Sequence, residues 1–241
     1  MTAATTELMQ QFKAEASRAG VVVHETRDAE EARNCVLMLA QERNVKRVVK
    51  SKSKVASEIG LREHLEKAGI GVKETDLEEW IAQLAGQTTV RQRTIEQVAE
   101  LISEGIGEKL KPDPKVLLSA AHRALRQSCI DADMGISEAD FAIAETGTLV
   151  IVGNEGNTRL VAVLPRMHVT MVDCENLVPT LDDAAARLKS LAKKAPGQRM
   201  LSYVTYITGR NTTADIPGAI FARAQGPEEE HIVLVHKDVG K

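Results

Sequence analysis

Aromatic residues and cysteines are scarce in this sequence. Only 2% of its 241 residues are aromatic, and its three cysteines (Cys35, Cys129 and Cys174) lie far apart with no CxxC pair. The hydrophobic core must therefore be built from aliphatic residues and alanine. An odd, scattered set of cysteines argues against a disulfide framework and against a zinc or iron–sulfur site made by this chain alone. The six histidines show no ligand spacing either, so no metal site is expected.

Long hydrophobic runs and a strong charge imbalance are also lacking. No apolar run approaches the ~18 residues needed to cross a bilayer, and the first twenty residues contain no secretory signal. We therefore expect a cytoplasmic protein without membrane insertion. The formal net charge of −3 removes the usual electrostatic reason to expect nucleic-acid binding.

The pattern of apolar residues predicts an α/β fold, with a mostly parallel sheet flanked by helices in a single domain over residues 1–241. Short apolar runs alternate with helical periodicity over residues 21–90, which is typical of βα units. Two amphipathic helices predict a helical annex around residues 91–130. Residues 131–240 are predicted to form a mixed sheet region that carries most of the motifs. Its expected strands lie at 141–144, 149–152, 160–164, 169–172, 201–207 and 232–235.

The loop Lys50-Ser51-Lys52-Ser53 is a candidate anion site between a strand and a helix. Ligands gather at the carboxyl ends of strands in open α/β sheets, and a helix N-terminus offers free N–H donors. Two lysines and two serines there suit a phosphate or a carboxylate. The alternative is a solvated loop in which Ser53 caps the helix, because no Walker sequence is present.

The segment Glu145-Thr146-Gly147-Thr148 is a second candidate site. A glutamate at a strand end is a candidate nucleophile, general base or acceptor for substrate hydroxyls. Gly147 allows close backbone approach, and the two threonines offer donors. The alternative is an ordinary turn.

Three further polar stretches are candidates for ligand binding or catalysis. His168, beside a predicted strand, is a candidate for proton transfer or carboxylate binding, with a structural histidine as the alternative. The candidate ligand-binding residues are Asn154, Glu155, Gly156, Asn157 and Arg159, which otherwise form a hairpin turn, and Thr208, Gly209, Thr213 and Asp215 in a later loop.

The order of these motifs resembles the lactate-utilisation (LUD) domain family. The similarity is closest to the N-terminal domain of the family's iron–sulfur protein B branch, and it is dense from about residue 131 to 235. It rests on Asp133–Gly135, Phe141–Thr148, Asn154–Asn157, Leu164-Pro165 with His168, Val178–Thr180, and Thr208-Gly209 with Thr213–Ile216.

The resemblance implies a NagB/RpiA/CoA-transferase-like sheet and a role in oxidising L-lactate to pyruvate within an iron–sulfur-dependent system. Longer members of the branch carry ferredoxin-type cysteine clusters after this domain, and this sequence has none. We therefore expect no cofactor on this chain. The iron–sulfur clusters are expected only on a partner, one of the iron–sulfur lactate-utilisation proteins.

Three functions remain open on the sequence. The first is a ligand-binding or accessory subunit of the lactate-oxidising system, with a small carboxylate or phosphate-bearing ligand. The second is a stand-alone CoA-transferase-like or isomerase-like enzyme that uses Glu145, with Lys50 and Lys52 holding an anion. The third is a non-catalytic scaffold. The oligomeric state is left open. We predict that a bound ligand or anion lies near Lys50–Ser53, Glu145–Thr148 and Asn154–Asn157, clustered at one rim, with Glu145 and the Lys50–Ser51 corner lining a single pocket.

Overall fold

The computed structural model of the chain describes residues 3–86, 93–153, 156–194, 201–210, 212–213, 221–222 and 226–236. The helices are α1 (Ala3–Arg18), α2 (Ala29–Glu42), α3 (Lys54–Glu58), α4 (Leu61–Lys67), α5 (Leu77–Leu84), α6 (Ile95–Ile106), α7 (Pro114–Asp131), α8 (Asn157–Val163), α9 (Leu181–Lys194) and the short 3₁₀ turn η1 (Cys174–Asn176). None of these described helices is long and apolar enough to cross a bilayer.

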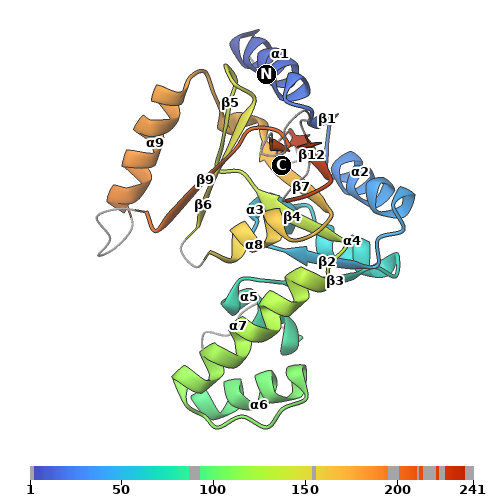
Figure 1. Ribbon diagram of the computed structural model, residues 1–241, viewed down its shortest axis with the longest axis vertical. Coiled ribbons are helices and arrows are strands. Elements are labelled where there is room, and N and C mark those ends of the chain that lie inside the picture. Colours follow the sequence, from blue (N-terminus) through green and yellow to red (C-terminus); the bar gives the residue numbers. More distant parts are fainter. Residues whose placement is uncertain are drawn as a thin grey trace.

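Two main sheets occupy the body of the molecule (Figure 1). The strands are β1 (Val22–Thr26), β2 (Arg47–Lys50), β3 (Gly71–Glu74), β4 (Met134–Glu138), β5 (Phe141–Ile143), β6 (Thr148–Gly153), β7 (Met167–Asp173), β8 (Leu177–Val178), β9 (Tyr203–Ile207), β10 (Thr212–Thr213), β11 (Phe221–Ala222) and β12 (Glu229–Val235). Strands β10 and β11 form a separate antiparallel pair.

The large sheet has the order β1-β12-β7-β4-β2-β3, and all its neighbouring strands are parallel. Parallel neighbours require crossover connections. Helices α2 to α7 supply those between β1 and β4, whereas α8, α9 and the strands of the small sheet lie in the later crossovers. All residues of the central strand β7 are buried, as expected for a sheet covered on both faces. The predicted α/β class with a mostly parallel sheet is confirmed.

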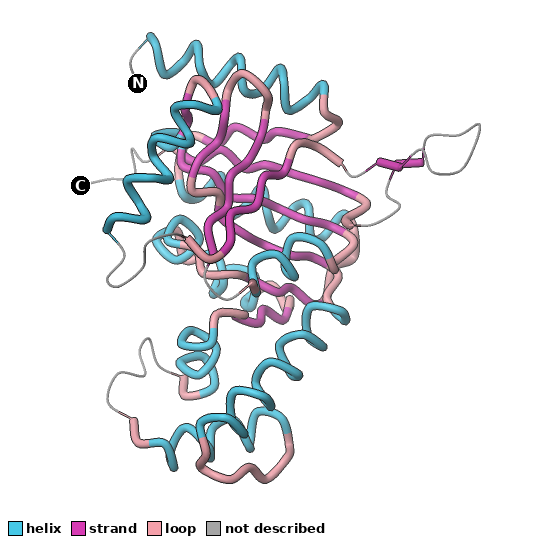
Figure 2. Tube along the Cα trace, turned by 60° about the vertical axis from the view of Figure 1, so that its left-hand side comes forward, coloured by secondary structure: helices cyan, strands magenta, loops and turns pink. Residues whose placement is uncertain are grey.

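Helices α2, α3 and α4 cover one face of the large sheet, where Val36, Val55 and Leu65 pack against strand residues such as Ile136 and Val169. The small sheet and α1 lie against the opposite face (Figures 1 and 2). The small sheet has the order β8-β5-β6-β9, and α9 packs on its outer side. The structure is therefore layered, with its core on both sides of the parallel sheet.

The predicted annex is present as α6 and the first half of α7, which extend away from the sheets (Figure 2). Together with α5 they enclose a separate apolar cluster that includes Trp80, Ile102, Leu117 and Ala121. A capping box at Thr94 starts α6. The second half of α7 returns to the body, where Cys129 contacts the sheet cluster around Val49. Helix α7 thus connects annex and body.

The strand expected at 160–164 is wrong, because these residues fall at the end of α8 and just after it. Periodicity alone does not separate a short apolar run in a strand from one in a buried helix. Gly135 on β4 makes room for the helix. A Cβ atom there would lie 2.0 Å from the carbonyl oxygen of Val161, so only glycine lets α8 lie directly on the strand.

We predict that Gly135→Ala lowers the free energy of unfolding by about 1–3 kcal/mol, because the added methyl group overpacks the contact with the α8 backbone. Gly71→Ala is the matched control in a strand, since its Cβ would meet only the Lys46 carbonyl at 3.6 Å. Urea unfolding of both variants measures the difference. Equal stability of the two variants would contradict this account of α8.

Candidate functional site

An open cleft of about 620 Å³ lies at the carboxyl ends of β2 and β4. The end of β6 and the first residues of α3 and α8 complete its wall. Its polar lining includes Lys52, Ser53, Glu79, Glu138, Asp140 and Asn157. The carboxyl edge of a parallel sheet is where ligands bind in open α/β folds, so this cleft is the candidate site.

Side chains of this protein already accept the hydrogen bonds that the first N–H groups of α3 donate in this cleft. The Ser53 hydroxyl accepts a hydrogen bond from the Ala56 N–H at 2.9 Å and donates to Glu138 Oε2 at 2.7 Å. The Val55 N–H donates to the same carboxylate oxygen at 2.9 Å. The alternative role of Ser53 as a helix cap is confirmed. Glu138 thus takes the place that an external anion was expected to fill.

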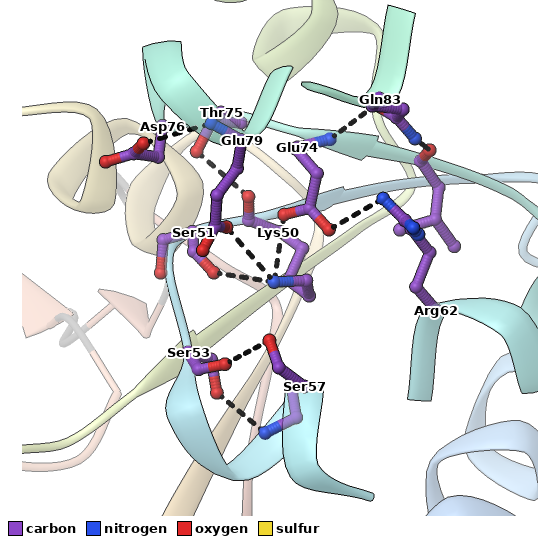
Figure 3. A network of polar contacts seen from close by, with 12 residues as sticks. Lys50, Ser51, Ser53, Ser57, Arg62, Glu74, Thr75, Asp76, Glu79 and Gln83 are labelled. Carbon is purple, nitrogen blue, oxygen red and sulfur yellow. Dashed lines mark hydrogen bonds and ion pairs between the residues drawn. The ribbon is translucent and has the colours of Figure 1, made fainter. Parts of the chain in front are cut away.

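Lys50 is fully buried behind the cleft, in a cluster of charges (Figure 3). Its Nζ lies 2.9 Å from Glu74 Oε2 and 3.6 Å from Glu79 Oε2, and it donates to the Ser51 carbonyl at 3.3 Å. Arg62 NH1 approaches the other oxygen of Glu74 at 3.7 Å. The charge of Lys50 is therefore engaged by carboxylates of this chain.

The charge cluster borders a second, smaller cavity of about 260 Å³, and Glu79 lines both cavities. Burial raises the pKa of Glu74 to about 7, although Lys50 opposes the shift, and neighbouring Glu79 adds to it. A carboxyl pair beside one buried lysine can hold a proton near neutral pH. Glu79 is the residue of this pair that also lines the cleft.

Lys52 differs from Lys50 because it is exposed and lines the cleft directly. Within the described part of the chain it makes no hydrogen bond or ion pair. Lys54, also at the cleft, is paired with Glu58 at 3.5 Å. Of the residues predicted at this loop, Lys52 is thus the cation available to a ligand.

The acidic residues Glu138 and Asp140 are cleft residues that the sequence reasoning missed. Asp140 Oδ2 accepts a hydrogen bond from the Val152 N–H at 2.7 Å, and burial raises its pKa. The available signal was the polar sequence Ser137-Glu138-Ala139-Asp140 directly after an apolar strand.

The segment around Glu145 lies elsewhere. The cleft contains Gly153, at the end of β6, whereas Thr148 begins that strand, about 16 Å away at ~3.3 Å per residue. A Cβ on Gly147, which has a φ of +63°, would lie 2.2 Å from the Ala16 nitrogen, so the turn is packed on α1. The expectation that Glu145 and the Lys50–Ser51 corner line one pocket is wrong.

The polar groups of the segment Glu145–Thr148 form hydrogen bonds near α1 and α9. Glu145 Oε1 accepts a hydrogen bond from the Leu181 N–H at 2.7 Å, at the start of α9. The hydroxyls of Thr146, Thr148 and Thr208 form a chain with 2.7 Å links. Gly209 packs against the Ala19 carbonyl. These contacts join the small sheet to two helices.

His168 is buried within the large sheet, outside the lining of the cleft. Its Nδ1 lies 2.6 Å from Glu230 Oε1, and its Nε2 lies 2.8 Å from Ser137 Oγ. Both ring nitrogens thus have partners on neighbouring strands, which fits the alternative of a structural histidine. A catalytic role for His168 stays a prediction.

The remaining predicted residues are distributed as follows. Asn157 lines the cleft and Gly156, with a φ of +75°, starts α8, while Arg159 is exposed on the same helix. Asn154, Glu155 and Asp215 lie outside the described residues, and Thr213 is described only as part of β10.

Comparison with known proteins identifies one family and a group of relatives. The LUD domain family model matches residues 9–235. Proteins named lactate utilization protein B are similar to this chain. The one from Bacillus licheniformis is 36% identical over 234 residues, covering 94% of this chain and 47% of that protein. The one from Bacillus subtilis is 35% identical over 226 residues, covering 91% and 46%. The chain thus spans about half the length of these relatives.

A solved structure has a similar fold. The crystal structure of a DUF162 family protein from Deinococcus radiodurans superposes with a TM-score of 0.55 and 14% identity, covering 96% of this chain and 98% of that one.

We predict that Glu74 makes the free energy of unfolding fall as the pH rises from about 5 to about 7. The folded-state pKa of about 7 exceeds the ~4.3 of an unfolded glutamate, so the folded protein binds the extra proton in that window. Relative to wild type, Glu74→Gln should therefore gain on the order of 2 kcal/mol between pH 5 and pH 8. Urea unfolding at both pH values measures this.

Glu63→Gln is the control on the same cavity. The pKa of Glu63 is lowered, chiefly by a hydrogen bond from its own backbone N–H, so its stabilising effect is lost only as the pH falls through that lowered value. Its difference from wild type should be constant from pH 6 to pH 8. The same pH dependence in both variants would disprove the assignment to Glu74.

Proposed function

Because the chain belongs to the LUD domain family, we propose that it is a ligand-binding component of a system that oxidises L-lactate to pyruvate. The observation that carries the proposal is the open polar cleft at the carboxyl edge of the sheet, with Lys52 as its available cation. The relatives named for lactate utilisation supply the substrate class. The cleft is the site where we place the small carboxylate.

The polar groups of the cleft suit a 2-hydroxy acid. The Lys52 ammonium is placed to hold the carboxylate, while Asn157 and Thr158 offer hydrogen bonds to the hydroxyl oxygen. Oxidation of lactate to pyruvate releases two electrons and two protons. Burial raises the pKa of Asp140 at the cleft wall, so this carboxylate is the candidate acceptor for a proton.

The two electrons require an acceptor such as an iron–sulfur cluster, and the cysteines of this chain are not placed to hold one. Its three cysteines belong to separate apolar clusters. Cys174 lies in the cluster with Phe12, Cys129 in the one with Val49, and Cys35, on α2, packs against the cluster that contains Val36. Burial raises the pKa of each thiol, to about 11 or 12. Within the described residues no group of side chains suits a metal ion. We therefore assign the iron–sulfur clusters to a partner and route no step through this chain's cysteines.

The stand-alone transferase hypothesis has less support. A nucleophilic Glu145 needs a cavity for its substrate, and the described cavities do not include it. Its carboxylate instead accepts a hydrogen bond at the start of α9. A scaffold without ligand is the remaining alternative, and the binding experiment below separates it from the proposal.

We predict that Lys52→Met weakens the binding of L-lactate and of pyruvate about tenfold, because one charge-assisted hydrogen bond is lost. Lys54→Met removes the same charge two residues away, from a side chain paired with Glu58, and should change the Kd less than about twofold. Isothermal titration calorimetry on both variants measures this. Absence of binding by the wild-type protein, or equal effects of both variants, would count against the cleft.

We also predict that the tagged protein captures a cysteine-rich iron–sulfur protein from extracts of its own cells grown on lactate. The captured fraction should contain iron and acid-labile sulfide in stoichiometric amounts, since an electron acceptor must accompany the bound substrate. An extract from cells grown without lactate is the control. Recovery of nothing except further copies of this chain would contradict the partner assignment.

A further inference from the structure

A third cavity, of about 280 Å³, lies where the annex meets the body. Helices α5, α7 and α8 form its walls, and its apolar lining consists of Leu77, Leu125, Cys129 and Leu160. Burial raises the pKa of the Cys129 thiol to about 11, so this thiol is an uncharged part of the lining. The interior therefore favours an apolar group of small size.

The rim of this cavity carries the cation Arg126 and the imidazole ring of His122. His122 and Arg126 line it from successive turns of α7, and both side chains are exposed. Neither makes a hydrogen bond or ion pair with another residue in the ranges that the structure describes. Arg123, on the same helix, is paired with Glu108 at 3.6 Å. Among the described residues, the guanidinium group of Arg126 thus has no partner and is available at the rim of this cavity.

The polar end of the cavity is formed by Thr75 and Asn157. The Asn157 amide donates to the Thr75 hydroxyl over 3.5 Å, which is a long hydrogen bond that a ligand can replace at small cost. Asn157 also lines the large cleft, so one side chain separates the two cavities.

We propose that this cavity is a second binding site, for a small carboxylate with an aromatic or branched aliphatic body. The body would pack between Leu125 and Leu160, and the carboxylate would meet Arg126 at the rim. An apolar interior with a cationic rim selects against both neutral apolar molecules and small hydrophilic acids. The site therefore differs in ligand class from the large cleft, and it does not depend on the function proposed for that cleft.

The test uses benzoate and its neutral isostere benzamide as probes. Methyl NMR spectra of the whole chain, recorded during titration, report on Leu77, Leu125 and Leu160 at this cavity and on Ile151 and Val152 at the large cleft. We expect benzoate to shift the leucine signals and to bind more tightly than benzamide. Arg126→Met should weaken benzoate binding about tenfold and leave benzamide binding unchanged.

Two further variants complete the experiment. Arg123→Met removes the same charge from a paired arginine on α7 and should change benzoate binding less than about twofold. Leu160→Phe narrows the cavity and should weaken both probes. Shifts confined to Ile151 and Val152, or equal effects of Arg126→Met and Arg123→Met, would overturn the proposal. Loss of benzoate binding in Lys52→Met alone would assign the probe to the large cleft and would equally overturn it.

Discussion

The buried ion pair between Lys50 and Glu74 is the interaction on which the rest of this structure depends. The two residues face each other on adjacent parallel strands, β2 and β3, and Glu79 on α5 completes the cluster. A buried lysine without partners would cost several kcal/mol, so β2, β3 and α5 must keep this arrangement. Because α5 also packs in the annex, the same cluster fixes where the annex meets the sheet. Both the cleft and the cavity at the annex follow from this junction.

Strand β6 separates two sets of polar groups that the sequence places close together. One set is at the end of the strand, in the cleft; the other, around Glu145 and Thr148, joins the small sheet to α1 and α9. The motifs that this chain shares with the LUD family therefore include residues that hold the fold together as well as residues that line a cavity. Proximity in the sequence does not separate these two roles. The length of β6 does, because it puts Thr148 and Gly153 at opposite ends of an extended strand.

The two neighbouring cavities differ in the chemistry they offer. The large cleft is rich in carboxylates, of which Glu138 and Asp140 already accept hydrogen bonds from the backbone. Lys52 is the ammonium group of its lining that has no partner in the described part of the chain. The cavity beside α7 is apolar with a cationic rim. Asn157 contributes to both. The two proposals together place a small hydroxy acid and a larger, more apolar acid in adjoining cavities.

The sequence by itself determined the fold class, because alternating apolar runs and helical periods depend only on local spacing. It likewise determined the annex, through the capping box at Thr94 and the amphipathic helices after it. It also placed the Lys50–Ser53 loop after a strand, at the edge of the sheet where the cleft lies. Only the tertiary structure decided that 160–164 belongs to a helix region and that Glu145 faces another part of the molecule. It also decided that Lys50 is ion-paired with Glu74, whereas Lys52 has no partner among the described residues. These outcomes depend on contacts between residues distant in the chain, such as Gly135 with Val161, which no local pattern contains.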